Sequence, residues 1–302
     1  MGDLAVTTKK TFHDNLDAVD ALLGKHFPLS KIEDEISIRV GPTAIMARVP
    51  RGFRDELMPR YQGFLWEGKG DFIVEAARDD EIGESLLIYT DIQVCSRPGR
   101  KVHYVFRWDF LARIDAEKHT ASILIAPIGP AVCVDSIFRI TTSFAAVDKG
   151  GFLLHAAAIS TPKGGFLFCG VSGSGKSTIA KMSQESYDVI TDEMALVEKV
   201  DDGYLIRGTP FWGQLQMSVN RSAPLRAVLL LSQASASLVQ DIPLTQALPE
   251  FMKTILYFGQ NFETTDELLN VTLDFLAKVP IKKLSFQADR SMWEAIHDKF
   301  GR

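Results

Sequence analysis

The sequence contains little cysteine, no long apolar run and no block of one charge, and each absence narrows what the protein can be. The three cysteines, Cys95, Cys133 and Cys169, are widely spaced and odd in number, so they form neither a disulfide framework nor a known zinc spacing. No apolar stretch approaches the roughly 20 residues that span a bilayer. No secretory signal pattern is evident either, so we expect a cytoplasmic protein without a membrane partner.

Charge and composition set further limits. The net charge of −5, without a basic run, argues against broad nucleic-acid binding. Apolar residues make up 46% and charged residues 24% of the 302 positions, which is an ordinary balance for a globular protein. This length allows one large domain or two ordinary ones.

The apolar pattern divides the chain into a β-rich first part and a mixed second part. A helix is predicted over residues 12–26, and strands are predicted over 36–40, 85–94, 103–108 and 122–126. A further helix is predicted over 135–148, where Gly150-Gly151 ends it. We therefore expect a β-rich N-terminal domain over residues 1–134, for substrate or partner recognition, and a second domain over residues 135–302.

The second part alternates strand and helix signals. Strands are predicted over residues 152–159, 165–169, 187–191, 194–197, 204–207, 227–231 and 281–286. The turn at 161–164 should join the first two in a hairpin, and the apolar run 227–231 suits a central strand. Thr264-x-x-Glu267 and Ser291-x-x-Glu294 are capping patterns that open helices. The expected fold is α/β (α+β), with a mixed sheet flanked by helices.

The most informative motif is Gly170-Val171-Ser172-Gly173-Ser174-Gly175-Lys176-Ser177, the G-x-x-x-x-G-K-[ST] Walker A pattern. It stands between an apolar strand and a helical segment, as a P-loop does. Glycines let successive N–H groups point at phosphate oxygens. Lys176 would reach the β- and γ-phosphates, and Ser177 would place its hydroxyl on Mg²⁺. The motif predicts binding of ATP with Mg²⁺ by Gly170, Ser172, Gly173, Ser174, Gly175, Lys176, Ser177 and Thr178.

Three features outside this loop are candidates for chemistry. Asp192-Glu193 follows a short apolar strand, where a carboxylate can hold Mg²⁺ or accept a proton, and strand alternation should turn only one of the two toward the phosphates. His155 lies on the strand before the loop, although a lone histidine on an apolar strand is more often a core residue. Arg207 could neutralise charge on a transferred phosphoryl group.

The ordered set of His155, Gly170–Ser177, Asp192-Glu193 and Arg207-Gly208 resembles the catalytic domain of the bacterial HPr serine kinase/phosphorylase family. This resemblance covers about residues 150–215 and implies the P-loop fold of the phosphoenolpyruvate carboxykinase type, a homo-oligomer, Lys176 on phosphate, Ser177 on Mg²⁺, and Glu193 as proton acceptor beside His155. From its position after the strand, Asp192 is a further candidate ligand of Mg²⁺. Two departures stand out: Asp-Glu replaces the family's Asp-Asp, and no glutamate directly precedes Arg207-Gly208.

The resulting expectation is a kinase that transfers the γ-phosphoryl group of ATP to a hydroxyl, with a serine of a peptide or small protein as the preferred acceptor. The resemblance is closer to divergent HPr-kinase-like proteins encoded beside peptide natural-product genes. Two alternatives stay open, a kinase for a small-molecule alcohol and a nucleotide-responsive binding protein with little catalysis. The base is either Asp192 or Glu193.

Overall fold

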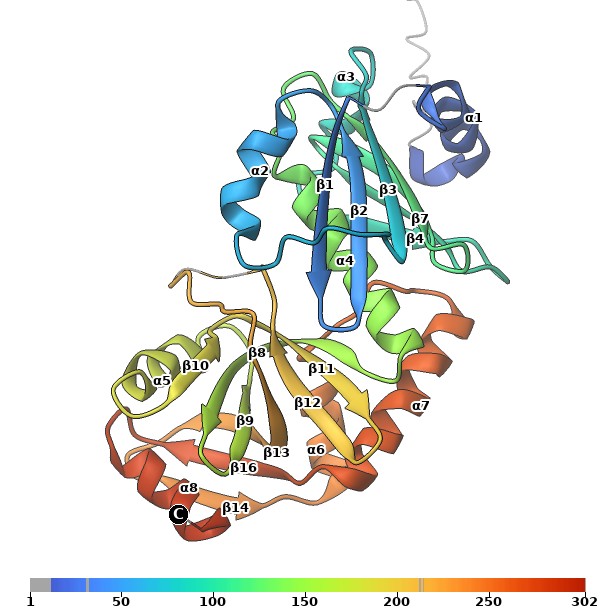
Figure 1. Ribbon diagram of the computed structural model, residues 1–302. Coiled ribbons are helices and arrows are strands. Elements are labelled where there is room, and N and C mark those ends of the chain that lie inside the picture. The colour runs from blue at the N-terminus through green and yellow to red at the C-terminus, as the bar shows by residue number, and fades with distance from the viewer. Residues whose placement is uncertain (1–11, 31–32, 212, 214, 302) are drawn as a thin grey trace, which may run out of the picture.

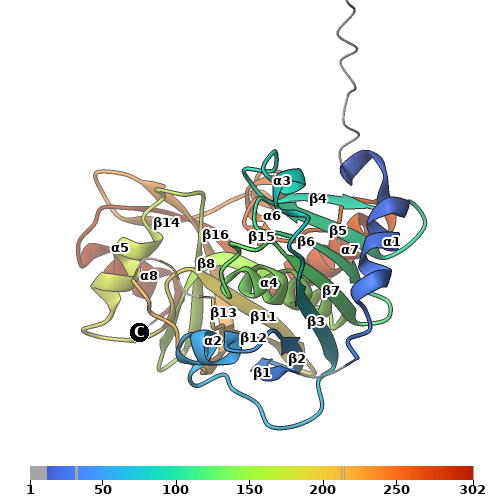
Figure 2. The same ribbon diagram turned by 90° about the horizontal axis from the view of Figure 1, so that it is seen from above.

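The computed structural model describes residues 12–30, 33–211, 213 and 215–301. These residues form a mixed α/β protein with two mixed β-sheets, one in each half of the chain, which confirms the expected fold class (Figures 1 and 2). The first sheet contains strands from residues 34–125 and the second contains strands from residues 152–286.

The first sheet has seven strands in the order β1-β2-β3-β7-β6-β5-β4. Their bounds are β1 Asp34–Val40, β2 Thr43–Val49, β3 Phe72–Arg78, β4 Gln93–Ser96, β5 Val102–Arg107, β6 Phe110–Asp115 and β7 Thr120–Ile125. β3 runs parallel to β2 and to β7, and the other neighbours are antiparallel. Alternate residues of a strand point to the buried face of this sheet. In β1 these residues are Ile36, Ile38 and Val40.

The helices of the first half are the short η1 Phe12–Asp14, α1 Leu16–His26, α2 Phe53–Tyr61 and α3 Gly83–Leu86. The predicted strand over 85–94 is wrong for most of its length. The Asp79 carboxylate accepts the N–H groups of Glu81 and Ile82 and so starts a helical turn. The buried Ile82 and Leu86 are then four residues apart, on one face of that turn.

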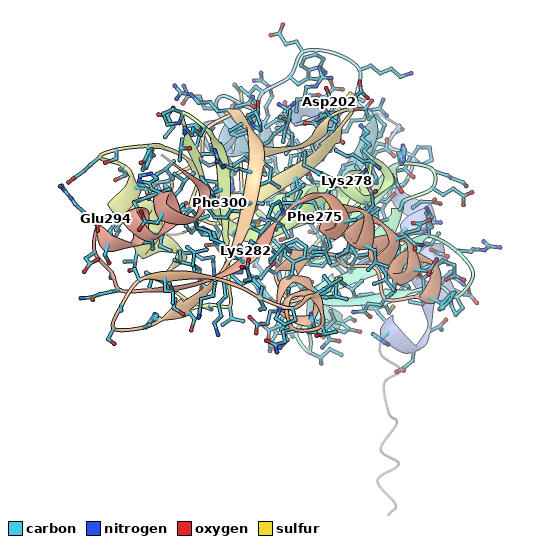
Figure 3. The ribbon with its side chains drawn as sticks, turned by 90° about the horizontal axis from the view of Figure 1, so that it is seen from below. Asp202, Phe275, Lys278, Lys282, Glu294 and Phe300 are labelled. Carbon is cyan, nitrogen blue, oxygen red and sulfur yellow. The ribbon has the colours of Figure 1, made fainter. Side chains whose placement is uncertain are left out.

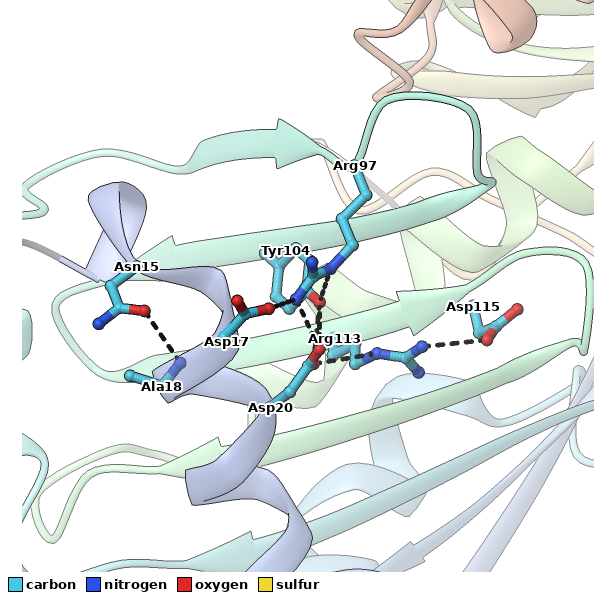
Figure 4. A network of polar contacts seen from close by, with 8 residues as sticks. All are labelled: Asn15, Asp17, Ala18, Asp20, Arg97, Tyr104, Arg113 and Asp115. Carbon is cyan, nitrogen blue, oxygen red and sulfur yellow. Dashed lines mark hydrogen bonds and ion pairs between the residues drawn. The ribbon is translucent and has the colours of Figure 1, made fainter.

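A network of charged side chains holds α1 on the first sheet (Figure 4). Arg97, at the end of β4, donates to Asp17 at 2.7 Å and to Asp20 at 2.8 Å. The Tyr104 hydroxyl donates to Asp20 at 2.8 Å, and Arg113 pairs with the same carboxylate at 3.3 Å. One helical carboxylate therefore collects three donors from the sheet.

The second sheet has nine strands, seven of them in the order β10-β8-β11-β12-β13-β16-β14. The bounds are β8 Phe152–Thr161, β9 Gly164–Cys169, β10 Asp188–Thr191, β11 Met194–Val200, β12 Gly203–Gly208, β13 Ser222–Gln233, β14 Leu238–Asp241, β15 Ile255–Leu256 and β16 Ile281–Phe286. β8 and β9 form the predicted hairpin. β13 pairs with β9, β12 and β16, which confirms its central position.

The helices of the second half are α4 Cys133–Asp148, α5 Lys176–Ser183, α6 Leu244–Met252, α7 Phe262–Lys278 and α8 Ser291–Phe300. The capping box predicted at Thr264 is wrong, because Asn261 caps α7 and accepts the N–H of Thr264 at 3.2 Å. Within the described ranges, no helix has both the length and the apolar character needed to cross a membrane.

Alternation along β8 decides which helices cover which face of the second sheet. Phe152, Leu154, Ala156 and Ala158 pack with Phe251 of α6 and Phe275 of α7. On the opposite face, Leu153 joins the core of the first half, whereas Ala157 and Ile159 pack with α5 and α8. Figure 3 shows α7 with Phe275 and Lys278 and α8 with Glu294 and Phe300. On this face His155 lies between Leu153 and Ala157, at the boundary between the core of the first half and the helices α5 and α8.

Helix α4 lies between the two sheets (Figure 1). Its buried Ile137, Phe138 and Ile140 belong to the core that contains the strands of the first sheet. The same core includes Leu153 and Leu196 of the second sheet. The predicted boundary after residue 134 therefore falls in the first turn of a helix that packs on both halves.

Candidate functional site at the phosphate loop

The loop between β9 and α5 has a backbone that only glycine accommodates easily. Gly173 and Gly175 have φ of +78° and +106°. A Cβ on Gly175 would lie 2.5 Å from Phe286 Cζ, and a Cβ on Gly170 would lie 2.5 Å from Ser174 Oγ. The spacing of glycines in the motif thus matches positions where backbone conformation or close packing requires them.

The loop presents N–H groups to an open pocket. Gly175 is the N-cap of α5, and its carbonyl accepts the N–H of Ile179, so the N–H groups of the three residues between have no acceptor within the helix. The positive end of the helix dipole lies at the same place. The pocket measures about 410 Å³ and is lined by His155, Ser172, Gly173, Gly175, Lys176, Ser177, Thr178, Glu193, Gly213 and Gln233.

Lys176 holds its ammonium inside the loop. The residue is buried, and its Nζ donates to the carbonyl of Gly170 at 2.8 Å and to that of Val171 at 3.2 Å. Burial lowers the pKa of Lys176, and the negative charge of Glu193 opposes this shift. The Lys176 ammonium and the N–H groups at the start of α5 therefore lie at the same pocket. Together they form the donor set that an oligophosphate requires.

Across the pocket, His155 and Glu193 form a pair. His155 Nε2 lies 2.9 Å from Glu193 Oε1, and both side chains are half-buried. Burial lowers the pKa of His155, the positive charge of Lys176 lowers it further, and Glu193 opposes both. A neutral imidazole donating through Nε2 would orient the carboxylate and leave it free to accept a proton.

The neighbouring carboxylate is directed elsewhere. Asp192 is only 1% exposed, and its two oxygens accept the N–H groups of Leu215 and Met217, each at 3.3 Å. Burial raises the pKa of Asp192, and these N–H donors oppose the shift. Of the two acidic residues, the structure brings Glu193 to the phosphate loop and turns Asp192 into the protein.

Arg207 does not reach this pocket. It lies on β12 and pairs with Glu198 of β11. Its Cδ would lie 3.1 Å from a Cβ placed on Gly41, which belongs to the turn between β1 and β2. The structure therefore places this guanidinium between the two halves of the molecule, with its carboxylate partner on the adjacent strand.

Two lining residues were absent from the predicted set. Gln233, at the end of β13, donates through Nε2 to the carbonyl of Gly173 at 2.9 Å. A Cβ on Gly213 would lie 2.6 Å from Glu193 Oε2. The position of Gln233 was readable, because it ends the strand parallel to the one that enters the loop. Gly213 could not be singled out, because a glycine in a loop indicates only a turn or an irregular segment.

Among the described residues, no three His, Cys, Asp or Glu side chains gather as a metal site. Ser177 lines the pocket, and the buried Ser174 Oγ has no hydrogen-bond partner in the described part of the chain. A Mg²⁺ ion held by one hydroxyl, water and phosphate oxygens fits these residues better than a cation enclosed by protein ligands.

Comparison with known families adds one finding. A family model described as SynChlorMet cassette protein ScmC matches residues 132–300, which is more than half of the chain. The chain belongs to the ScmC family. The part shared with ScmC proteins runs from α4 to α8 and includes the phosphate loop, His155 and Glu193. A search of curated proteins found no match.

Proposed function

We propose that the protein is an ATP- and Mg²⁺-dependent kinase that phosphorylates a hydroxyl group, with a serine of a peptide or small protein as its acceptor. One observation carries this proposal: the His155–Glu193 pair faces Lys176 and the N–H groups of the loop across a single pocket. A phosphate site and a carboxylate able to deprotonate an alcohol are the two parts that phosphoryl transfer requires.

On the phosphate side, the loop N–H groups and Lys176 would bind the β- and γ-phosphates, and Ser177 would hold Mg²⁺. When bound, Mg²⁺ would neutralise charge on the phosphate oxygens. Lys176 would exchange the carbonyls of Gly170 and Val171 for phosphate oxygens, since its ammonium already lies within the loop.

On the acceptor side, Glu193 would accept the hydroxyl proton while the hydroxyl oxygen bonds to the γ-phosphorus. The bond between the γ-phosphorus and the β–γ bridging oxygen breaks, and ADP leaves with that electron pair. His155 would keep the Glu193 carboxylate aimed into the pocket through the 2.9 Å contact. Positioning and charge neutralisation supply most of the rate enhancement in such transfers.

The peptide acceptor rests on the similarity to HPr-kinase-like proteins. Two outcomes compete with it: a kinase that acts on a small-molecule alcohol, and a nucleotide-binding protein without turnover. The test uses the full chain, Mg²⁺ and ATP labelled at the γ-phosphate, with serine-containing peptides, small alcohols or no acceptor. Label in peptides supports the proposal, label only in small alcohols replaces the acceptor, and tight ATP binding without transfer to any acceptor removes the kinase activity.

A further inference from the structure

The chain between β12 and β13 forms a loop that runs past the acceptor side of the pocket. Its base is tight, because a Cβ on Gly208 would lie 2.0 Å from the carbonyl oxygen of Val219. Val219 N donates to the carbonyl of Ile190 at 3.0 Å, and Ser218 bridges to Thr191. We call residues 209–211, 213 and 215–219 the acceptor loop.

One end of the acceptor loop is anchored in the first half of the protein. Phe211 is fully buried in the core that contains the first sheet and α4. The guanidinium of Arg139, on α4, lies 5.7 Å from the centre of the Phe211 ring. Thr209 Oγ1 accepts the N–H of Phe211 at 3.3 Å and donates to the carbonyl of Met194 at 2.9 Å. This end of the loop is therefore held by packing against residues distant in sequence.

The other end is anchored by Asp192. Its carboxylate accepts the N–H groups of Leu215 and Met217, and its own N–H donates to the Met217 carbonyl at 3.1 Å. A buried carboxylate is stable only when hydrogen bonds or cations satisfy its oxygens. Here backbone donors of the acceptor loop provide two of those bonds, which explains why an acidic residue is buried next to the pocket.

Gly213 lies between these two anchors, directly against the proposed base. A Cβ at this position would lie 2.6 Å from Glu193 Oε2 and 2.9 Å from Glu193 Cβ. The Glu193 side chain is thus confined by His155 on one side and by the Gly213 backbone on the other. A carboxylate confined in this way has few orientations open to it, as efficient proton transfer requires.

We infer that Phe211 and Asp192 are positioning residues, which hold Gly213 against Glu193 and so aim this carboxylate into the pocket. The inference rests on the proposed function and extends it. It gives Asp192 a structural task in place of a metal ligand, and it makes turnover depend on the core of the first half even though the nucleotide contacts only the second half.

The first test compares two buried phenylalanines of the same core. Phe211→Ala is expected to lower kcat at least tenfold and to leave the Kd for MgATP within twofold, because the phosphate loop is untouched. Phe110→Ala, in β6, removes a ring of equal size from the same core without touching the acceptor loop, and its kcat per folded molecule should stay within about twofold. Phe211→Leu should restore most of the activity. Equal loss of kcat in both alanine variants would overturn the inference.

The second test separates a loop anchor from a metal ligand. Asp192→Asn should lower kcat several-fold at an unchanged half-saturating Mg²⁺ concentration, whereas Ser177→Ala should raise that concentration. Gly213→Ala should lower kcat at least tenfold because its methyl group displaces the carboxylate. Gly24→Ala, in an open position of α1, is its matched control and should leave kcat unchanged. A raised Mg²⁺ requirement in Asp192→Asn would contradict the inference.

A spectroscopic readout makes the inference testable without turnover. The Nε2 proton of His155, donated to Glu193, should give an NMR signal that is shifted downfield. Phe211→Ala and Gly213→Ala should weaken or remove that signal, and Phe110→Ala and Gly24→Ala should retain it. If the wild-type protein transfers no phosphoryl group, the proposed function fails, and this signal alone then decides the inference: an unchanged signal in both loop variants would refute it.

Discussion

The pocket has two walls that are built differently. The proposed phosphate wall is a run of consecutive residues, 170–178, whose backbone turns between one strand and the helix that follows it. The proposed acceptor wall gathers His155, Glu193 and Gly213 from separate elements, and its loop is anchored through Phe211 in the other half of the protein. The phosphate wall should therefore respond mainly to changes in the loop and its immediate neighbours, whereas the acceptor wall should also respond to substitutions far from the pocket.

The largest effect should come from the phosphate wall. Lys176→Ala removes the buried ammonium, and phosphoryl transfer should fall by about a thousandfold or more. The measurement is initial velocity with labelled ATP at saturating Mg²⁺. Lys181→Ala, an exposed lysine on the same helix, is the control and should retain full activity. Full activity of the Lys176→Ala protein would show that this lysine takes no part in phosphoryl transfer.

The next largest effect should come from the proposed base. Glu193→Gln keeps the size of the side chain but cannot accept the hydroxyl proton, so kcat should fall roughly a hundredfold or more. Calorimetry should find its affinity for MgATP changed by no more than about threefold. Glu185→Gln, an exposed position after α5, provides the control. If Glu193→Gln lost nucleotide affinity and kcat equally, the two walls would not be separate in function.

A smaller effect concerns the stability of the core behind the acceptor wall. His103 is fully buried and stacks on Phe144 of α4 at 4.4 Å between ring centres. Burial lowers its pKa from 6.5 to about 4. The unfolded chain therefore takes up a proton below pH 6.5 that the folded protein takes up only near pH 4. The contribution of this ring to stability should be nearly constant above pH 6.5 and should fall as pH drops, by roughly 2 kcal/mol at pH 5.

Urea unfolding at pH 7 and pH 5 measures this loss. His103→Gln should be less stable than the wild type at pH 7 but should lose about 2 kcal/mol less between the two pH values. Identical pH slopes for wild type and His103→Gln would show that this ring does not titrate as its burial predicts.

The smallest effect is expected at Arg207. Because it pairs with Glu198 away from the pocket, Arg207→Ala should change the rate of phosphoryl transfer by no more than about threefold and lower stability by about 1 kcal/mol. Paired velocity and unfolding measurements test both numbers. A hundredfold loss of rate would instead show that Arg207 takes part in phosphoryl transfer.

Most of the second half could be predicted from local patterns. The β8–β9 hairpin, the central β13 and the helix 135–148 all follow from apolar runs bounded by glycine, proline or polar turns. The first half was less readable. A carboxylate at Asp79 starts a helix where apolar residues had indicated a strand. α2 was missed because Pro59 lies inside it and only Phe53, Leu57 and Tyr61 mark its buried face.

The same contrast holds within the site. The residues of the loop that line the pocket could be named from the sequence, since one short stretch contains them. The choice between Asp192 and Glu193 could not be made, because it depends on the N–H groups of Leu215 and Met217, more than twenty residues later. The position of Arg207 could not be predicted either, because its side chain lies beside Gly41 in the turn between β1 and β2, a contact between residues distant in sequence.

The shared core has a practical consequence for anyone who wishes to divide the protein. Cutting the chain after residue 134 would remove the strands of the first sheet that now cover Leu153, Leu196 and Phe211. These three side chains would then be exposed to water. The resulting fragment, which retains all but the first three residues of the ScmC match, would therefore be prone to aggregation and would lack the support of its acceptor loop. Assays of the isolated second half would understate what the intact chain can do.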